Sequence, residues 1–146
     1  MADLGRGVLA GLIATLVISL VMILRLSAGI MTEYNPIEII NLTAHDLFGT
    51  TDSRLVGWPL HFVVGTAIWG IVFPLVERVL PGRGYASRGI VFGTLAWLIV
   101  MITLFPLAGS GFFAMGFGIA VPVMTLIGHW VYGLVLGGTY GWLKGL

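Results

Sequence analysis

The sequence predicts an all-α integral membrane protein with four transmembrane helices. Of its 146 residues, 58% are hydrophobic and only 13 are charged, 7 Lys or Arg and 6 Asp or Glu, whereas an average soluble domain carries roughly 25% charged residues. The mean hydropathy is +1.07. A chain of this size exposes much of its surface and cannot hide so much apolar area in a water-soluble globule. These values exclude a soluble enzyme, a disordered chain and a nucleic-acid partner, and they indicate a lipid bilayer as the surroundings.

Four apolar stretches supply the expected spans, because a helix needs roughly 20 mostly apolar residues to cross a bilayer. The stretches are Gly7–Leu26, Leu55–Leu80, Gly89–Leu107 and Ile119–Leu143. The first is longer than the apolar core of a typical signal peptide, roughly 7–15 residues, so we expect it to remain as a span. The chain is therefore expected to form a single transmembrane domain over residues 1–146.

A short amphipathic helix is predicted over Pro36–Phe48, between the first two spans. Asn35 is a suitable N-cap, Pro36 fits the first helical position and Glu38 the third. Gly49 stands where a glycine C-cap belongs. We expect this helix to lie on the outer membrane surface.

Basic residues near the span ends indicate the orientation, because cytoplasmic loops are enriched in Lys and Arg. Five fall on one side of the predicted spans: Arg6, Arg78, Arg83, Arg88 and Lys144. Two basic residues and four acidic ones fall on the other: Arg25, Arg54, Glu33, Glu38, Asp46 and Asp52. Both termini are therefore expected to be cytoplasmic, in a prokaryotic inner (cytoplasmic) membrane. Glu77 and Arg78, at the inner end of the second span, are expected to reach the interface and pair there.

An internal repeat relates residues 6–80 to residues 88–143. Five residues of the first span recur 82 positions later in the third: Arg6, Gly7, Gly11, Ala14 and Leu16 match Arg88, Gly89, Gly93, Ala96 and Leu98. Four residues of the second span recur 68 positions later in the fourth: His61, Val63, Gly65 and Gly70 match His129, Val131, Gly133 and Gly138. The pattern predicts two tandem helical hairpins related by a pseudo-two-fold axis along the membrane normal.

The repeat places His61 and His129 at equivalent positions, each followed one turn later by a glycine, Gly65 and Gly133. Ionisable residues inside a span are costly and are candidates for function. A neutral imidazole is a ready ligand for haem iron or a metal ion. We expect the two histidines to be axial ligands of a haem b, with the two glycines leaving flat space between helices.

A transition-metal site is the competing interpretation of the same histidines. His45 and Asp46, on the predicted surface helix, would then join His61 and His129 as ligands for Zn, Cu or Fe. His45 pointing to solvent is the alternative. The chain has no Cys, which excludes thiolate ligands and disulfides.

The chain resembles a family of small, uncharacterised prokaryotic membrane proteins with four transmembrane helices. The segments that carry the resemblance are Arg6-Gly7 with Gly11, Trp58 with His61 and Gly65, Leu80-Pro81-Gly82 before Arg88-Gly89, and Gly128-His129 with Tyr132-Gly133. The resemblance implies a four-span fold and brings no catalytic residues with it.

Three functions are expected in order of preference, and none of them assigns the chain a catalytic activity of its own. The first is an accessory subunit that holds a haem or metal ion beside a larger membrane or respiratory complex. The second is a structural or assembly subunit whose histidines only pack, and the third is a small oligomeric transporter or channel. Titratable histidines could also pass protons near a quinone. The abundant glycine, 22 residues, favours close helix packing and association with itself or a partner in each case.

Overall fold

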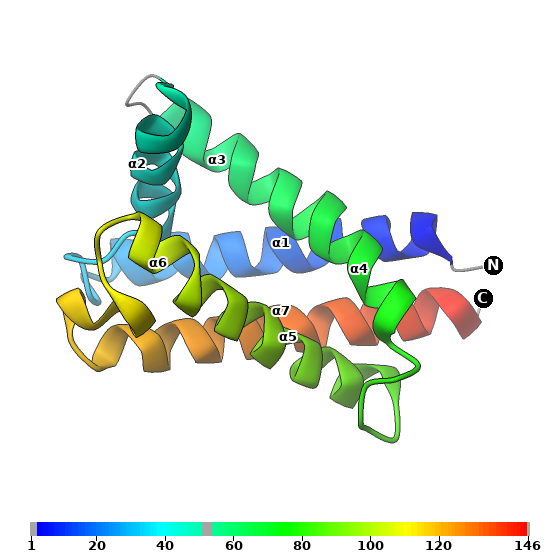
Figure 1. Cartoon of the computed structure of the whole chain (residues 1–146). Helices are drawn as coiled ribbons and strands as arrows, with labels where there is room; N and C mark the ends of the chain where they lie inside the picture. Colours follow the sequence, from blue (N-terminus) through cyan, green and yellow to red (C-terminus); the bar gives the residue numbers. More distant parts are fainter. Residues whose placement is uncertain (1–2, 51–53, 146) are drawn as a thin grey trace.

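The computed structural model describes residues 3–50 and 54–145, with Arg54 described by its backbone alone. Asp52, one of the acidic residues expected on the outer side, lies outside the described residues. Within the described ranges the regular structure is entirely helical. Its elements are α1 (Leu4–Ser27), α2 (Pro36–Phe48), α3 (Arg54–Phe62), the π-helix η1 (Val63–Ile68), α4 (Trp69–Val76), α5 (Tyr85–Ile102), α6 (Leu104–Leu107), the 3-10 helix η2 (Phe112–Phe117) and α7 (Ala120–Gly145) (Figure 1).

Four helical segments are long and apolar enough to cross a membrane: Leu4–Ser27, Leu55–Val76, Tyr85–Leu107 and Ala120–Gly145. The prediction of four membrane-spanning helices is confirmed in the length and hydropathy of these segments. The second segment ends at Val76 and not at Leu80 as predicted, because the chain turns ahead of Pro81.

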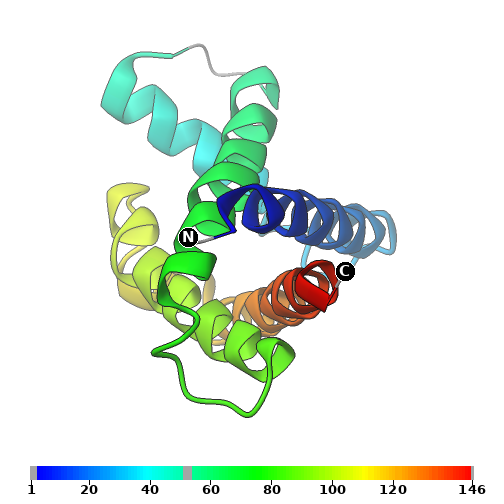
Figure 2. The same ribbon diagram turned by 90° about the vertical axis from the view of Figure 1, so that its right-hand side faces the viewer.

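The helices pack in a consistent order around the core. α7 packs along α5 and also along α1, while η1 and α4 also pack on α1. Viewed from the end, α1 and α7 lie side by side, with α4 next to α1 and α5 next to α7 (Figure 2). Both termini and the α4–α5 loop lie at one end of the bundle, and α2, α6 and η2 lie at the other (Figure 1).

Aromatic rings join three helices in the core near the end that holds the termini. Phe73 of α4 meets Phe92 of α5 edge-on at 5.3 Å between ring centroids. It also meets Tyr140 of α7 at 5.5 Å. Phe73 and Tyr140 are almost completely buried, so these rings fill the space between α4, α5 and α7.

Glycines allow the helix backbones to approach closely. A Cβ added at Gly7 would collide with the carbonyl oxygen of Gly70, and one added at Gly11 would lie 2.9 Å from that of Gly65. Pro74 explains why the Gly70 oxygen is free for this contact, because proline has no N–H to donate to the carbonyl four residues earlier. The expected role of glycine in close helix packing is confirmed at these positions.

The predicted helix over Pro36–Phe48 is present with both of its predicted caps. Asn35 Oδ1 accepts a hydrogen bond of 3.1 Å from the Ile37 N–H. Gly49 has a φ of 65° and donates its N–H to the His45 carbonyl at 2.8 Å. The helix runs across the direction of α1 and packs on α3 (Figure 1), so it closes the end of the bundle opposite the termini.

Glycine packing between α5 and α7 yields a first prediction, based on two glycines of α7. A Cβ at Gly133 would collide with the carbonyl oxygen of Gly89, whereas one at Gly138 would meet nothing within 4 Å. We expect Gly133→Ala to lower the free energy of unfolding by about 1–3 kcal/mol, because the helices must move apart. Gly138→Ala is the matched control, and we expect it to be neutral or stabilising by up to ~1 kcal/mol. Thermal unfolding followed by circular dichroism in detergent measures both, and equal melting temperatures would contradict the packing.

Candidate functional site

His61 lies in the last turn of α3 and forms a hydrogen bond to another helix. Its Nε2 is 3.1 Å from Ser19 Oγ of α1. The Ser19 side chain is only 6% exposed. The rings of Trp58 and Phe62 meet the imidazole edge-on, with centroids 5.9 and 5.8 Å away. The imidazole therefore links α3 to α1 and is packed against two aromatic rings.

His129 lies on α7 and bonds within its own helix. Its Nδ1 is 2.8 Å from the carbonyl oxygen of Thr125, one turn earlier. A carbonyl only accepts, so Nδ1 carries the proton and donates it. The His129 backbone lies close to α5, because a Cβ at Gly93 would collide with the His129 carbonyl oxygen. The His129 ring is thus held by its own helix, while its backbone packs against α5.

The two histidines lie on segments that both pack against α1. In the described part of the chain each ring is hydrogen-bonded to Ser19 or Thr125 and not to the other ring.

The π-helix η1 follows His61 directly and alters the helical register. The Trp69 N–H donates to the Val64 carbonyl, five residues back, so the segment holds one residue more than an α-helical turn. The buried Tyr132 hydroxyl of α7 donates to the Gly65 carbonyl at 2.6 Å. The sequence interpretation missed both this segment and the Tyr132 bond. No feature of the amino-acid composition marks the π-helix or this hydrogen bond, although Tyr132 is a polar residue inside an apolar span.

Whether a haem b fits as expected depends on the space beside Gly65 and Gly133. A Cβ at Gly65 would collide with the side chain of Thr15 of α1, and one at Gly133 with the backbone of Gly89. Both glycine positions are therefore filled by neighbouring helices, and neither leaves flat space for a porphyrin. The residues around His61 and His129 do not fit the expected haem b site.

The structure does not bring the four expected metal ligands together. His45 and Asp46 are both exposed, and His45 Nδ1 is 2.6 Å from the Thr50 carbonyl oxygen. Among residues 3–50 and 54–145 no group of three or more His, Cys, Asp or Glu is placed to hold a metal ion. The reason lies in α2, which buries Ala44 and so turns the next residue, His45, to the outside.

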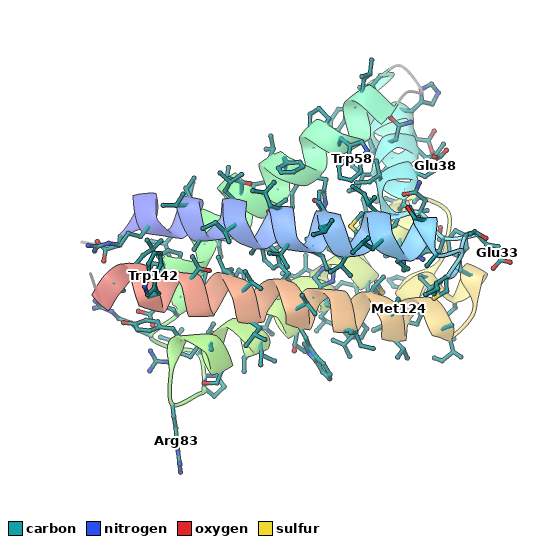
Figure 3. All side chains as sticks on the ribbon, turned by 180° about the vertical axis from the view of Figure 1, so that it is seen from behind. Glu33, Glu38, Trp58, Arg83, Met124 and Trp142 are labelled. Carbon is teal, nitrogen blue, oxygen red and sulfur yellow. The ribbon has the colours of Figure 1, made fainter. Side chains whose placement is uncertain are left out.

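An apolar groove lies beside His61, between α1 and α3. Its volume is about 390 Å³, and its lining residues are Leu16, Ser19, Leu20, Ile23, Trp58 and Phe62. The Trp58 side chain lies on the α1 side of α3 (Figure 3). Ser19 is the polar residue of this lining, and its hydroxyl is already bonded to His61. The groove therefore offers apolar surface but little with which to recognise a polar group.

A family of unknown function, DUF6789, matches the chain over residues 1–146. The chain belongs to this family. No curated protein and no solved structure matches it. Membership confirms the expected resemblance to an uncharacterised family, whereas the prokaryotic source stays a prediction.

Glu77 of this DUF6789 chain forms a second polar cluster, at the end that holds the termini. It was expected to reach the membrane interface, but its side chain is 2% exposed, and it turns into the bundle. Arg88 of α5 donates to its Oε2 at 2.8 Å. The expected pairing with Arg78 is present at 3.8 Å, and Lys144 lies at 3.9 Å. A buried carboxylate needs such partners, which come from three different parts of the chain.

Removal of the Arg88 guanidinium should destabilise the protein, because it leaves the Glu77 carboxylate buried without its hydrogen-bond donor. Breaking a buried ion pair costs about 3–5 kcal/mol, and we expect Arg88→Ala to fall near the lower limit, since Arg78 and Lys144 remain close. Adding Glu77→Gln should restore part of the loss by removing the unpaired charge. Arg83→Ala, in the exposed part of the α4–α5 loop, is the control (Figure 3). Chemical unfolding in detergent measures each variant, and a double variant less stable than Arg88→Ala would contradict this account.

Proposed function

We propose that the chain is a non-catalytic membrane subunit in which His61 joins two helices and His129 serves packing, and that it works in a homo-oligomer or a larger membrane complex. The observation that carries this proposal is the hydrogen bond between His61 Nε2 and Ser19 Oγ, 3.1 Å long, which joins α3 to α1. In hydrocarbon an unsatisfied polar group costs several kcal/mol. A polar pair between helices therefore stabilises one packing arrangement over others.

The surroundings of the histidines support a packing role over the haem and metal interpretations. His129 is bonded to Thr125 of its own helix. The glycines next to the two histidines are used for helix contacts. These features favour the second function expected from the sequence, a structural or assembly subunit whose histidines only pack.

The composition of the spans weighs against a transporter of cations or protons. None of the four membrane-spanning segments contains an Asp or Glu. Carboxylates within spans are the usual relay groups of pumps and transporters. The two carboxylates next to span ends, Asp3 and Glu77, are each held in an ion pair. We therefore favour a structural role over transport.

Two tandem hairpins, one copy over residues 6–80 and the other over residues 88–143, form part of the proposal. In each copy a glycine of the first helix lies close to the matching glycine of the second helix. A Cβ at Gly11 would meet the backbone of Gly65, and a Cβ at the equivalent Gly93 would lie 3.5 Å from the backbone of Gly133. This agreement supports a pseudo-two-fold axis along the membrane normal.

The π-helix accounts for one mismatch between the proposed copies. Gly70 packs on Gly7, whereas the equivalent Gly89 packs on both Gly133 and Gly137, and Gly138 has nothing within 4 Å. In this proposal the extra residue of η1 moves the correspondence by one position. Gly70 would then match Gly137, and not Gly138 as in the sequence comparison.

The proposed orientation places both termini in the cytoplasm of a prokaryotic cell, with the chain in the inner membrane. The end that holds the termini also carries most of the basic residues, as cytoplasmic ends do. Arg25, at the opposite end, is engaged locally. It donates hydrogen bonds to the carbonyls of Ile30, Met31 and Tyr34 at 3.0, 2.9 and 2.7 Å. These hydrogen bonds give Arg25 a structural role, which explains why a basic residue lies on the outer side.

The decisive experiment uses protein extracted from its own membranes in a mild detergent. We expect size exclusion with light scattering to give a particle heavier than one 15.6 kDa chain in its micelle. We expect the oxidised and dithionite-reduced spectra to be flat in the visible range, and metal analysis to find far less than one ion per chain. A Soret band that shifts on reduction, with one chromophore per chain, would overturn the packing role, and a monomer would overturn the proposed association.

Substitutions of His61 separate a packing histidine from a ligand. His61→Leu leaves the Ser19 hydroxyl without its cross-helix partner, and we expect a loss of about 1–2 kcal/mol, the usual range for a polar contact between membrane helices. His61→Asn keeps a group that can bond to Ser19, so its loss should be smaller. His45→Asn is the control, at an exposed histidine bonded only to the nearby Thr50 carbonyl, and should change stability by less than about 0.5 kcal/mol. Melting temperatures in detergent give the order, and equal losses for Asn and Leu would count against a packing bond.

A further inference from the structure

We propose that a pocket at the end of the bundle that holds the termini binds the phosphate group of an anionic membrane lipid. The pocket has a volume of about 310 Å³ and lies between the start of α1, the end of α4 and the end of α7. Its lining residues are Asp3, Pro74, Leu75, Glu77, Arg78, Tyr140 and Lys144. We refer to it below as the basic pocket.

The charges around the basic pocket do not balance. Asp3 is paired with Arg6 at 3.1 Å, and Glu77 is hydrogen-bonded to Arg88 at 2.8 Å. Both carboxylates therefore already have a close cationic partner, and two further cations, Arg78 and Lys144, line the same pocket. The six groups together carry two excess positive charges.

Arg78 and Lys144 keep donors for a ligand. They lie 3.8 and 3.9 Å from Glu77 Oε1, which is too far for a hydrogen bond. Lys144 Nζ is held 5.3 and 5.4 Å from the ring centroids of Tyr85 and Tyr140, and an ammonium group has three N–H donors. The buried Glu77 thus orients two cations at the pocket wall without using their donors fully.

The position of the basic pocket favours a lipid as the source of the phosphate. Asp3 directly precedes α1, Glu77 directly follows α4, and Lys144 lies in the last turn of α7. These are the ends of three membrane-spanning segments, at the level where lipid headgroups lie. Leu75, which lines the pocket, is 59% exposed and continues into the apolar surface of the spans. A headgroup phosphate can occupy the pocket while its acyl chains lie along that surface, as occurs at basic pockets between transmembrane helices.

The test measures lipid binding to the full purified chain by native mass spectrometry, with phosphatidylglycerol and phosphatidylcholine of the same acyl chains. We expect phosphatidylglycerol to bind more tightly. Arg78→Gln should weaken phosphatidylglycerol binding about tenfold, the usual effect of losing one charge-assisted hydrogen bond. Arg78 is 81% exposed, so this variant should fold normally. Lys144→Met tests the second cation, with melting temperature as the check on folding.

The matched control is Arg83→Gln, which removes the same charge from the same end of the bundle without touching the pocket. Arg83 extends away from the bundle (Figure 3), and we expect its loss to change binding less than twofold. An equal effect of Arg78→Gln and Arg83→Gln would overturn the proposal in favour of general surface charge. Equal binding of the two lipids would also overturn it. Competition by millimolar inorganic phosphate as strong as that by phosphatidylglycerol would show a free phosphate site and overturn the lipid assignment.

Discussion

Close contact between helix backbones is the constraint on which the rest of this structure depends. In a bilayer the apolar side chains gain little by leaving lipid for protein, so helices associate through packing and hydrogen bonds. At Gly7, Gly89 and Gly133 the facing backbone is so near that a Cβ would collide with a carbonyl oxygen. These contacts fix the distance between α1 and α4 and between α5 and α7. All polar groups in the bundle then have to find partners within that fixed spacing.

The π-helix and Pro74 of the second span are part of the same close packing. A π turn and a helix-interior proline both disturb the regular α-helical hydrogen-bond pattern. The carbonyls at these places, those of Gly65 and Gly70, are the ones that other helices contact. Tyr132 donates to the first at 2.6 Å, and the backbone of Gly7 lies against the second. Irregularity in this span therefore provides the acceptors by which α7 and α1 attach to it.

The sequence predicted features that depend on local pattern and missed those that depend on tertiary distance. The number and approximate positions of the spans and the caps of α2 were predicted because hydropathy and the residues Asn35, Pro36 and Gly49 act within a few positions. The bond between Ser19 and His61 joins residues 42 positions apart on two apolar helices, and no periodicity links them. The burial of Glu77 was missed for a similar reason. A carboxylate at a span end normally reaches water, and here Arg88 and Lys144, from other helices, make the buried position tolerable.

The two polar clusters of the bundle differ in their charge. Near the end closed by α2, the neutral pair of Ser19 and His61 is surrounded by aromatic and aliphatic side chains, and its hydrogen bond occupies the only hydroxyl of the neighbouring groove. Near the termini, Glu77 is charged, buried and surrounded by more cations than it can satisfy. A neutral pair between helices serves to hold them, and it carries no charge that would attract an ion. A charged cluster with an excess of cations at a membrane surface attracts counter-ions, and the most concentrated anions there are lipid headgroups. The charge available to bind an anion is therefore concentrated at the end of the bundle that the histidines do not occupy.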